Sequence, residues 1–129
     1  MSSPELERQP LPENGVGETE IYGKAQWEVG LQKIIDDAPD KMREEFEQNG
    51  QKQPWTEVFR GRLALFGARL EILSLQRKMT RDLFLEVSGK LNDLLRQVES
   101  IHGEYELNGQ QPPEEKKREV LKKFGELIR

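Results

Sequence analysis

The sequence predicts an all-α fold in which shorter helices pack on one long central helix, as a helical hairpin or a coiled-coil-like bundle. Two observations predict this class. Large apolar residues recur at steps of three and four along most of the chain, which is the spacing of one helix face. No segment shows the alternation and turn signals of a β-hairpin. We expect one helical domain over residues 19–129, preceded by a tail over residues 1–18.

The tail is predicted from its composition. It contains Pro4, Pro10 and Pro12 together with several acidic residues, and it has few large apolar side chains. Such a segment cannot bury enough apolar surface to offset the conformational entropy that ordering would cost. We therefore expect residues 1–18 to be flexible.

Two short helices are expected next, over residues 23–36 and 38–48. The apolar spacing is helical throughout both, but Pro39 interrupts it, because proline has no N–H and its ring clashes with the preceding turn. Asp37, followed by Ala38 and the proline, has the pattern of a helix N-terminus. One helix with a kink at the proline is the alternative.

The longest periodic segment, residues 55–105, contains no proline and is predicted to form the central helix. Two apolar rows run along its first half, so its apolar face is too broad for a bare two-stranded seam and is expected to be covered from two sides. One row is Phe59, Leu63, Phe66, Leu70 and Leu73, and the other is Leu65, Ile72, Leu75 and Met79.

The length of this segment is its most informative property. A continuous helix over it would be about 75 Å long, whereas a compact domain of this chain length is about 35 Å across. Either the helix extends beyond what its own chain can cover, or it breaks. The two candidate breaks are near residue 80, where Thr80 can cap a new helix, and near residue 88, where Ser88 and Gly89 weaken the helix.

A last helix is expected over residues 113–128. Pro113 suits a first helical position, and the two glutamates that follow it suit the positive end of a helix. Because a helix of this length with one apolar stripe needs something to pack on, we expect it to fold back along the central helix.

An apolar helical surface in excess of what the short flanking helices can cover predicts self-association, as a homodimer, and contact with another protein. The small residues Gly61, Ala64, Gly67 and Ala68 would allow a second helix to approach closely. The candidate interface residues are Leu63, Phe66, Leu70, Leu73, Ile72, Leu75, Met79, Leu83, Val87, Leu91, Leu94 and Val98.

Basic residues on the first half of the central helix suggest nucleic acid as an alternative partner. The candidates are Arg60, Arg62, Arg69, Arg77, Lys78 and Arg81. The net charge of the chain is -4, and no aromatic residues are interleaved with these basic residues as they are in single-strand binders. The acidic residues between Asp36 and Glu47 are a nearer counter-charge, so we favour pairing within or between subunits.

Catalytic and cofactor chemistry finds little support in the sequence. Cysteine is absent, which excludes disulfides, thiolate zinc sites and a cysteine nucleophile. Glu99 and His102 share one helix face, but a single Glu-x-x-His unit is too few ligands for a bundle metal site. We therefore expect no cofactor, no metal and no enzymatic activity.

The sequence predicts a non-enzymatic helical protein–protein interaction module that acts as an adaptor, scaffold or regulator. A nucleic-acid-binding regulator is the alternative function. No apolar run approaches the roughly 20 residues of a membrane span, so we expect a cytoplasmic protein with no membrane contact.

Overall fold

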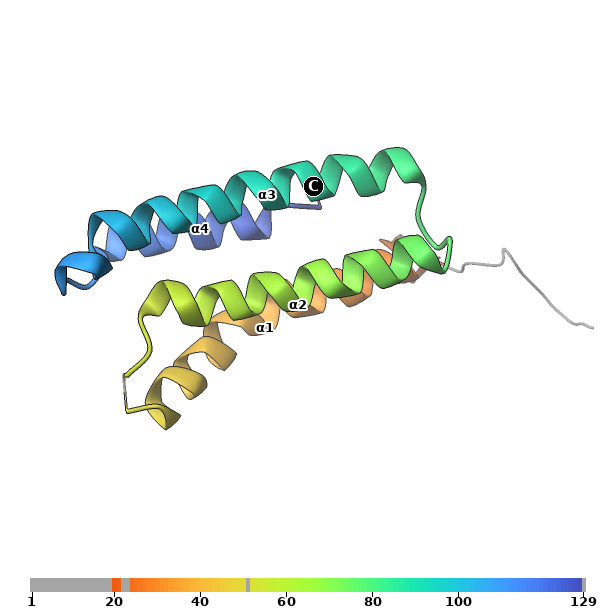
Figure 1. Ribbon diagram of the computed structural model, residues 1–129. Coiled ribbons are helices and arrows are strands. Elements are labelled where there is room, and N and C mark those ends of the chain that lie inside the picture. Colours follow the sequence, from red (N-terminus) through yellow and green to blue (C-terminus); the bar gives the residue numbers. More distant parts are fainter. Residues whose placement is uncertain (1–19, 22–23, 51, 129) are drawn as a thin grey trace, which may run out of the picture.

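The computed structural model describes residues 20–21, 24–50 and 52–128, and it shows four helices packed as an antiparallel bundle (Figure 1). The predicted all-α class is confirmed. The helices are α1 (Gln26–Gln48), α2 (Trp55–Leu75), α3 (Arg81–Glu104) and α4 (Glu114–Gly125), with the short 3-10 helix η1 (Glu106–Asn108) between α3 and α4. The predicted tail over residues 1–18 lies outside the described residues.

A very short pair of strands precedes α1. Strand β2 (Glu20–Ile21) pairs with β3 (Lys24–Ala25) in antiparallel register, with Glu20 opposite Ala25. The sequence carried no signal for this pair. Each strand has only two residues, so the pair does not change the fold class.

The expectation of two short helices over residues 23–36 and 38–48 is wrong, and the alternative of one helix kinked at the proline is found, because α1 is one helix that passes through Pro39. Figure 1 shows α1 changing direction near its middle, as a proline inside a helix requires. Leu31 and Ile35 before the proline and Met42 after it are all buried in the same core. Both halves of the helix thus bury apolar side chains in one core, on either side of the bend.

The expectation of one long helix over residues 55–105 is also wrong in its continuous form. The segment forms α2 and α3, which run antiparallel to each other. The chain turns at the first of the two candidate breaks, where the Leu83 N–H donates to the Thr80 hydroxyl at 3.2 Å and so caps α3. Ser88 and Gly89 lie inside α3 and do not interrupt it.

The C-terminal end of α2 is closed by a cap that normally uses glycine. Arg77 has a φ of 58°, in the left-handed region. Its N–H donates to the Ser74 carbonyl at 3.0 Å, and the Lys78 N–H donates to the Leu73 carbonyl at 2.9 Å. These two bonds are the pair that defines a Schellman motif. Arginine therefore occupies the position that glycine usually fills at a helix end, so no glycine marks the end of α2 in the sequence.

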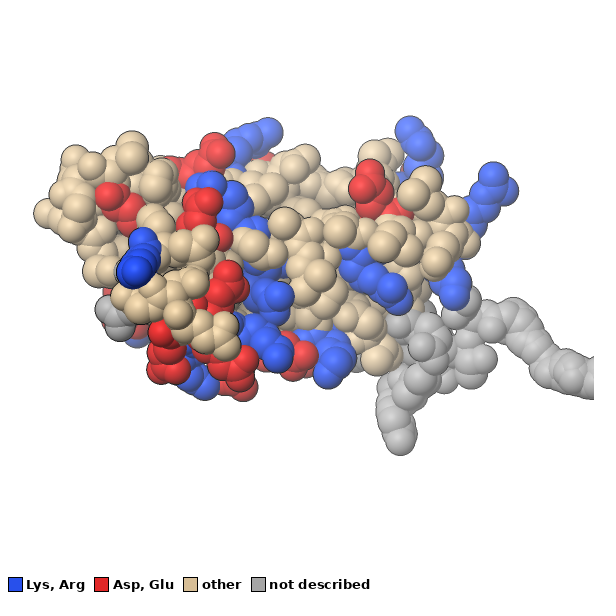
Figure 2. All heavy atoms as spheres, turned by 60° about the horizontal axis from the view of Figure 1, so that its bottom comes forward, with Lys and Arg blue, Asp and Glu red and all other residues tan. Residues whose placement is uncertain are grey.

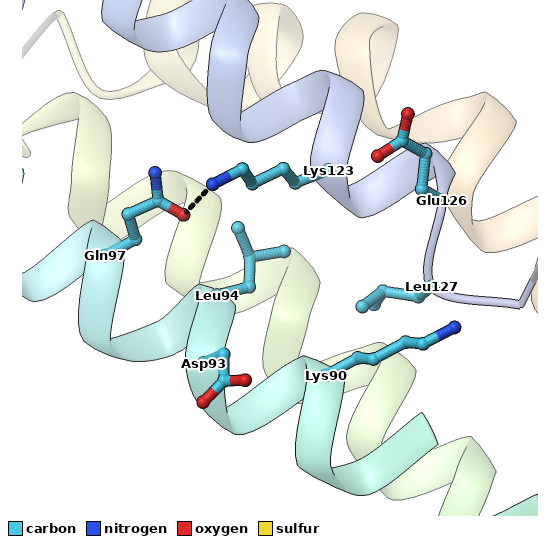
Figure 3. A pocket seen from close by; sticks show the side chains of 7 residues that line it. All are labelled: Lys90, Asp93, Leu94, Gln97, Lys123, Glu126 and Leu127. Atoms are coloured by element: carbon cyan, nitrogen blue, oxygen red, sulfur yellow. Dashed lines mark hydrogen bonds between the residues drawn. The ribbon is translucent and has the colours of Figure 1, made fainter. Parts of the chain in front are cut away.

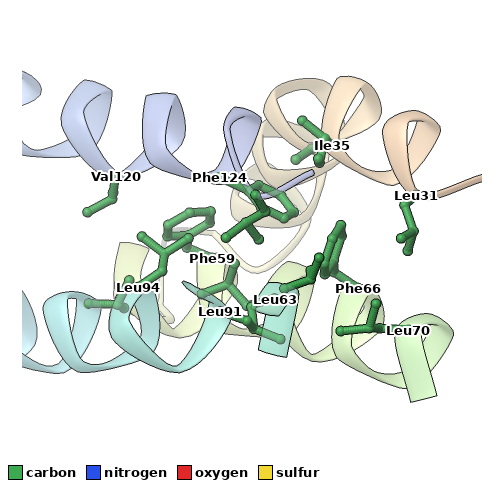
Figure 4. Packing of buried hydrophobic residues seen from close by; sticks show 14 of the residues in the cluster. Leu31, Ile35, Phe59, Leu63, Phe66, Leu70, Leu91, Leu94, Val120 and Phe124 are labelled. Atoms are coloured by element: carbon green, nitrogen blue, oxygen red, sulfur yellow. The ribbon is translucent and has the colours of Figure 1, made fainter. Parts of the chain in front are cut away.

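All four helices contribute to one apolar core (Figure 4). Phe124 of α4 packs edge-on against two aromatic rings of α2, with ring centroids 5.7 Å from Phe59 and 5.5 Å from Phe66. The buried apolar residues are Leu31, Ile35, Ala38, Met42, Val58, Phe59, Leu63, Phe66, Leu70, Leu73, Val87, Leu91, Leu94, Val98, Ile101, Val120, Phe124 and Leu127. The chain thus covers much of its long apolar face by folding back on itself.

The last helix packs back on the bundle as predicted, but it is shorter than residues 113–128. It ends at Gly125, and the following residues form a turn in which the Leu127 N–H donates to the Phe124 carbonyl at 3.3 Å. Leu127 is nevertheless buried, so the turn continues the apolar contact that the helix begins.

Of the four small residues on α2, only Gly67 lies at a close helix approach. A Cβ added there would lie 3.3 Å from Leu91 Cδ2 of α3, whereas one added to Gly61 would meet nothing within 4 Å. Ala64 and Ala68 are exposed. Within the chain, the expected close packing is therefore found at one of these positions.

The left-handed residue gives a direct test of the turn between α2 and α3. Arg77→Gly is expected to raise the free energy of unfolding by about 1 kcal/mol, because glycine has no Cβ to clash in this conformation. Chemical denaturation measures the change. The matched control is Gln76→Gly, at a right-handed φ of -81°, which is expected to lower stability by about 0.5–1 kcal/mol. Equal losses from both variants would contradict the capping role of Arg77.

Candidate interaction surface

Helix α2 is apolar on two opposite faces. Its inner face, which includes Phe59, Phe66 and Leu70, is buried in the core. Its outer face carries a second row at steps of three and four, which places that row on the far side of the helix from the core. We call this row the outer stripe, and it consists of Gly61, Leu65, Ala68, Ile72 and Leu75, all of them exposed.

The outer stripe departs from the usual pattern of a helix on the surface of a bundle. Such a helix has one apolar stripe toward the core and charged or polar residues opposite it. Leu65 is 43% exposed, Ile72 is 42% exposed and Leu75 is 78% exposed. Contiguous apolar surface of this kind is characteristic of contact sites with other proteins.

Charged residues of opposite sign flank the outer stripe. Arg62 and Arg69 lie on the side toward α1, since a Cβ on Gly30 of α1 would be 3.9 Å from Arg69 Nε. Glu57 and Glu71 lie on the other side, the one on which α2 meets α3. The stripe therefore has one basic edge and one acidic edge.

Most of the predicted interface residues belong to the core of this chain. Those that are buried are Leu63, Phe66, Leu70, Leu73, Val87, Leu91, Leu94 and Val98. They present no surface to a partner in this fold. Met79 and Leu83 are half-buried, while Ile72 and Leu75 are exposed. For those four residues, contact with a partner stays a prediction.

The predicted interface residues did not include Leu65, and Gly61, Ala64 and Ala68 were expected only as positions at which a second helix could approach closely. The signal for Leu65 was present, because two apolar rows on one helix cannot both face the same core. The sequence alone does not tell which row faces inward. The folded chain buries the row with the larger side chains, which includes both phenylalanines of the inner face.

The basic residues do not form one patch. Arg60 lies on a different side of α2 from Arg62 and pairs with Glu57 at 3.2 Å. Figure 2 shows acidic side chains gathered toward the end with the α1–α2 connection, and basic ones toward the middle and the other end. Arg77, Lys78 and Arg81 lie at and just after the turn between α2 and α3.

The expected pairing of these arginines with the acidic residues of α1 is absent from the ion pairs between described residues. The acidic residues of α1 pair within their own helix, with Asp37 at 3.4 Å from Lys33 and Asp40 at 2.6 Å from Arg43. Exposed pairs of this kind contribute little stability. The charges of α1 and α2 therefore do not fix how these two helices pack.

The most closely connected polar cluster joins the start of α2 to η1. The Glu106 carboxylate accepts hydrogen bonds from the Thr56 hydroxyl and from the Thr56 N–H, the latter at 3.0 Å. His102 Nδ1 lies 2.8 Å from the same carboxylate and 3.4 Å from the hydroxyl. Pro54 precedes α2 and has no side-chain cap, so Glu106 supplies the cap from a distant part of the chain.

This cluster combines a hydroxyl, an imidazole and a carboxylate, but its geometry is that of a structural cap. The hydroxyl and the imidazole both bond to one oxygen of Glu106, so the imidazole is not placed as the base for the hydroxyl. Thr56 is 0% exposed. Its hydroxyl cannot meet a substrate in this fold.

Metal binding finds no site in the described part of the chain. His102 contacts Glu106 and Thr56, and the predicted partner Glu99 does not join this cluster. No group of three or more His, Asp or Glu side chains among the described residues is arranged to hold a metal ion.

A shallow groove of about 610 Å³ runs between α3 and α4 (Figure 3). Leu94 and Leu127 line its apolar part, and both are buried. Lys123 Nζ donates to Gln97 Oε1 at 3.0 Å across the groove. The rim also carries Lys90, Asp93 and Glu126. Because it has charges of both signs, it favours neither an anionic nor a cationic ligand.

No protein-family model, curated protein or solved structure matches this chain. Within the described ranges, no helix combines the length and the apolar character needed to cross a bilayer. Function is therefore inferred from the surface and the polar cluster themselves.

The Glu106 cap predicts a specific dependence of stability on pH. Burial raises the pKa of the Glu106 carboxyl, but hydrogen bonds from the Thr56 hydroxyl, His102 and the Thr56 N–H, together with the charge of His102, outweigh burial and lower it below the ordinary value of 4.5. A carboxyl with a lowered pKa stabilises the fold above the unfolded-state pKa. That stability is lost as the pH falls through 4.5 and below.

Glu106→Gln is accordingly expected to lower the free energy of unfolding at neutral pH by about 1–3 kcal/mol. The difference from wild type should shrink as the pH is lowered. Urea denaturation at several pH values measures both effects. Glu99→Gln, at an exposed position of α3, is the control and should follow the wild type. A difference that does not change with pH would contradict the role of the charged carboxylate.

Proposed function

We propose that the protein is a non-enzymatic helical interaction module, an adaptor, scaffold or regulator, and that the outer stripe of α2 is its binding surface. One observation carries the proposal, namely that α2 exposes a second apolar row directly opposite its buried face. A helix with two apolar faces is the arrangement expected where a second helix packs on the outside.

The outer stripe has the features of a helix-to-helix contact. Leu65, Ile72 and Leu75 supply large apolar side chains. Among the small residues, Gly61 precedes Leu65, and Ala68 lies between Leu65 and Ile72. The small residues let a second backbone approach, while the large ones fill the space beside it. The partner is therefore expected to present an amphipathic helix.

The polar groups support a non-enzymatic role. Thr56, His102 and Glu106 hold the start of α2 against η1, and the only histidine of the chain is used in this cap. The groove between α3 and α4 gathers no nucleophile with a base. The groups that most resemble a catalytic set thus have a structural use.

The outer stripe proposal is tested with Leu65→Glu combined with Ile72→Glu. Charges on this face are expected to abolish capture of the partner while the helical content and the midpoint of unfolding stay near those of wild type. Quantitative pull-down from the native host measures capture. Leu107→Glu is the matched control, because Leu107 is 71% exposed and lies outside α2. If all three proteins capture the same set equally, the outer stripe is not the binding surface.

Nucleic acid binding is the second candidate, and one observation favours it. Arg62 and Arg69 have no ion-pair partner among the described residues and lie on the same edge of α2. Affinity for duplex DNA or structured RNA should then fall steeply with salt, and Arg62→Glu with Arg69→Glu should weaken it equally for every sequence. Titration at two salt concentrations measures this, and weak binding that is independent of salt would remove the candidate.

A further inference from the structure

We propose that the occupant of the outer stripe is a second copy of this chain, with the two α2 helices parallel and related by a two-fold axis. This inference rests on the proposed function and names its partner. The two charged edges of the stripe determine which surface can pack against it.

The outer stripe has the spacing of a coiled-coil seam. Gly61, Leu65, Ala68, Ile72 and Leu75 follow one another at alternating steps of four and three. Each edge of the seam is then defined by the residues next to these positions. The first edge consists of Arg62, Arg69 and Gln76, and the second of Glu57, Ala64 and Glu71.

In a parallel pair, each edge meets the opposite edge of the other copy, offset by five residues. Glu57 then faces Arg62 of the second copy, and the two-fold axis creates the same pair again. Ala64 faces Arg69, and Glu71 faces Gln76. The contacts across both edges are therefore attractive or neutral, and none brings like charges together.

In an antiparallel pair, each edge meets the same edge of the other copy. The register that pairs Leu65 with Leu75 brings Arg69 against Arg69 and Glu71 against Glu71. A shift by one heptad brings Arg62 against Arg69. Like charges that face each other destabilise a helix pair and select against the wrong arrangement. The charges of α2 thus favour the parallel arrangement.

The fold leaves room for this arrangement. The residues of α2 that are buried in the core lie on the far side of α2 from the stripe. Two copies can therefore meet along α2 with their bundles on opposite sides. A two-fold axis also brings the same patch of both copies together, so the acidic edge of each copy meets the basic edge of the other.

The absence of cysteine from the chain allows a direct test with single introduced cysteines. Leu75→Cys places a thiol at the end of the seam, where the two copies of one residue meet only if the helices are parallel. It is expected to form a disulfide-linked dimer under mild oxidation. Ser100→Cys, at an exposed position of α3, is the control and should remain uncrosslinked.

A second crosslinking experiment tests whether the two α2 helices are parallel or antiparallel. If the helices were antiparallel, a mixture of Leu65→Cys and Leu75→Cys chains would crosslink to each other in preference to Leu75→Cys with itself. That result would overturn the parallel arrangement.

Charge reversal tests the register. Glu57→Arg and Arg62→Glu are each expected to weaken the dimer about tenfold, because each places two pairs of like charges at the edges. An equimolar mixture of the two variants should recover dimers close to wild-type affinity, since both pairs between residues 57 and 62 are again opposite in sign. Sedimentation equilibrium at micromolar concentration measures these affinities. A mixture no stronger than its components would overturn the register.

The same measurement separates this inference from the proposed function. A wild-type chain that stays monomeric, or a dimer that survives Leu65→Glu with Ile72→Glu, overturns the inference. If the monomeric chain still captures another protein through Leu65 and Ile72, the proposed function stands and only the second copy is excluded. Loss of dimer in that variant, with dimer retained in Leu107→Glu, supports the inference.

Discussion

The reversal of the chain at Arg77 is the feature on which the rest of the structure depends. A left-handed residue and a threonine cap, only three positions apart, convert a segment with the length of a rod into the antiparallel pair α2 and α3. Once this pair exists, α1 and α4 pack against it and Phe124 lies between the rings of α2. The conformational energy that Arg77 costs in the left-handed region is small compared with the free energy of burying the apolar area that the reversal brings together.

The same reversal decides which surface remains for a partner. A continuous helix would have left much of its apolar face uncovered along its whole length. In the folded chain, the apolar residues of α3 that were expected to be interfacial, such as Val87 and Val98, are in the core. What remains is narrower and lies on α2 alone, as a stripe with a basic edge and an acidic edge. The candidate surface for a partner is therefore one side of α2 and not the whole segment over residues 55–105.

Apolar periodicity predicted the all-α class and the last helix, and the capping ability of Thr80 marked one of two candidate breaks, because each depends on neighbours in sequence. It left open whether one helix continues through Pro39, since that depends on burial on both sides of the bend. It could not find the stop at Arg77, where the cap has no glycine. The cluster of Thr56, His102 and Glu106 was equally hidden, because the chain brings Glu106 to Thr56 across a separation of 50 residues.

The cap that Glu106 places on the first turn of α2 has a consequence for recognition. It secures one end of the helix, and the hydrogen-bonded Schellman turn secures the other. With its inner side packed on the core, α2 is held at both ends and along its length. A molecule that docks on the stripe therefore meets a preorganised backbone, and little conformational entropy of α2 is lost on association. Affinity at this face is then governed by the fit of a few side chains.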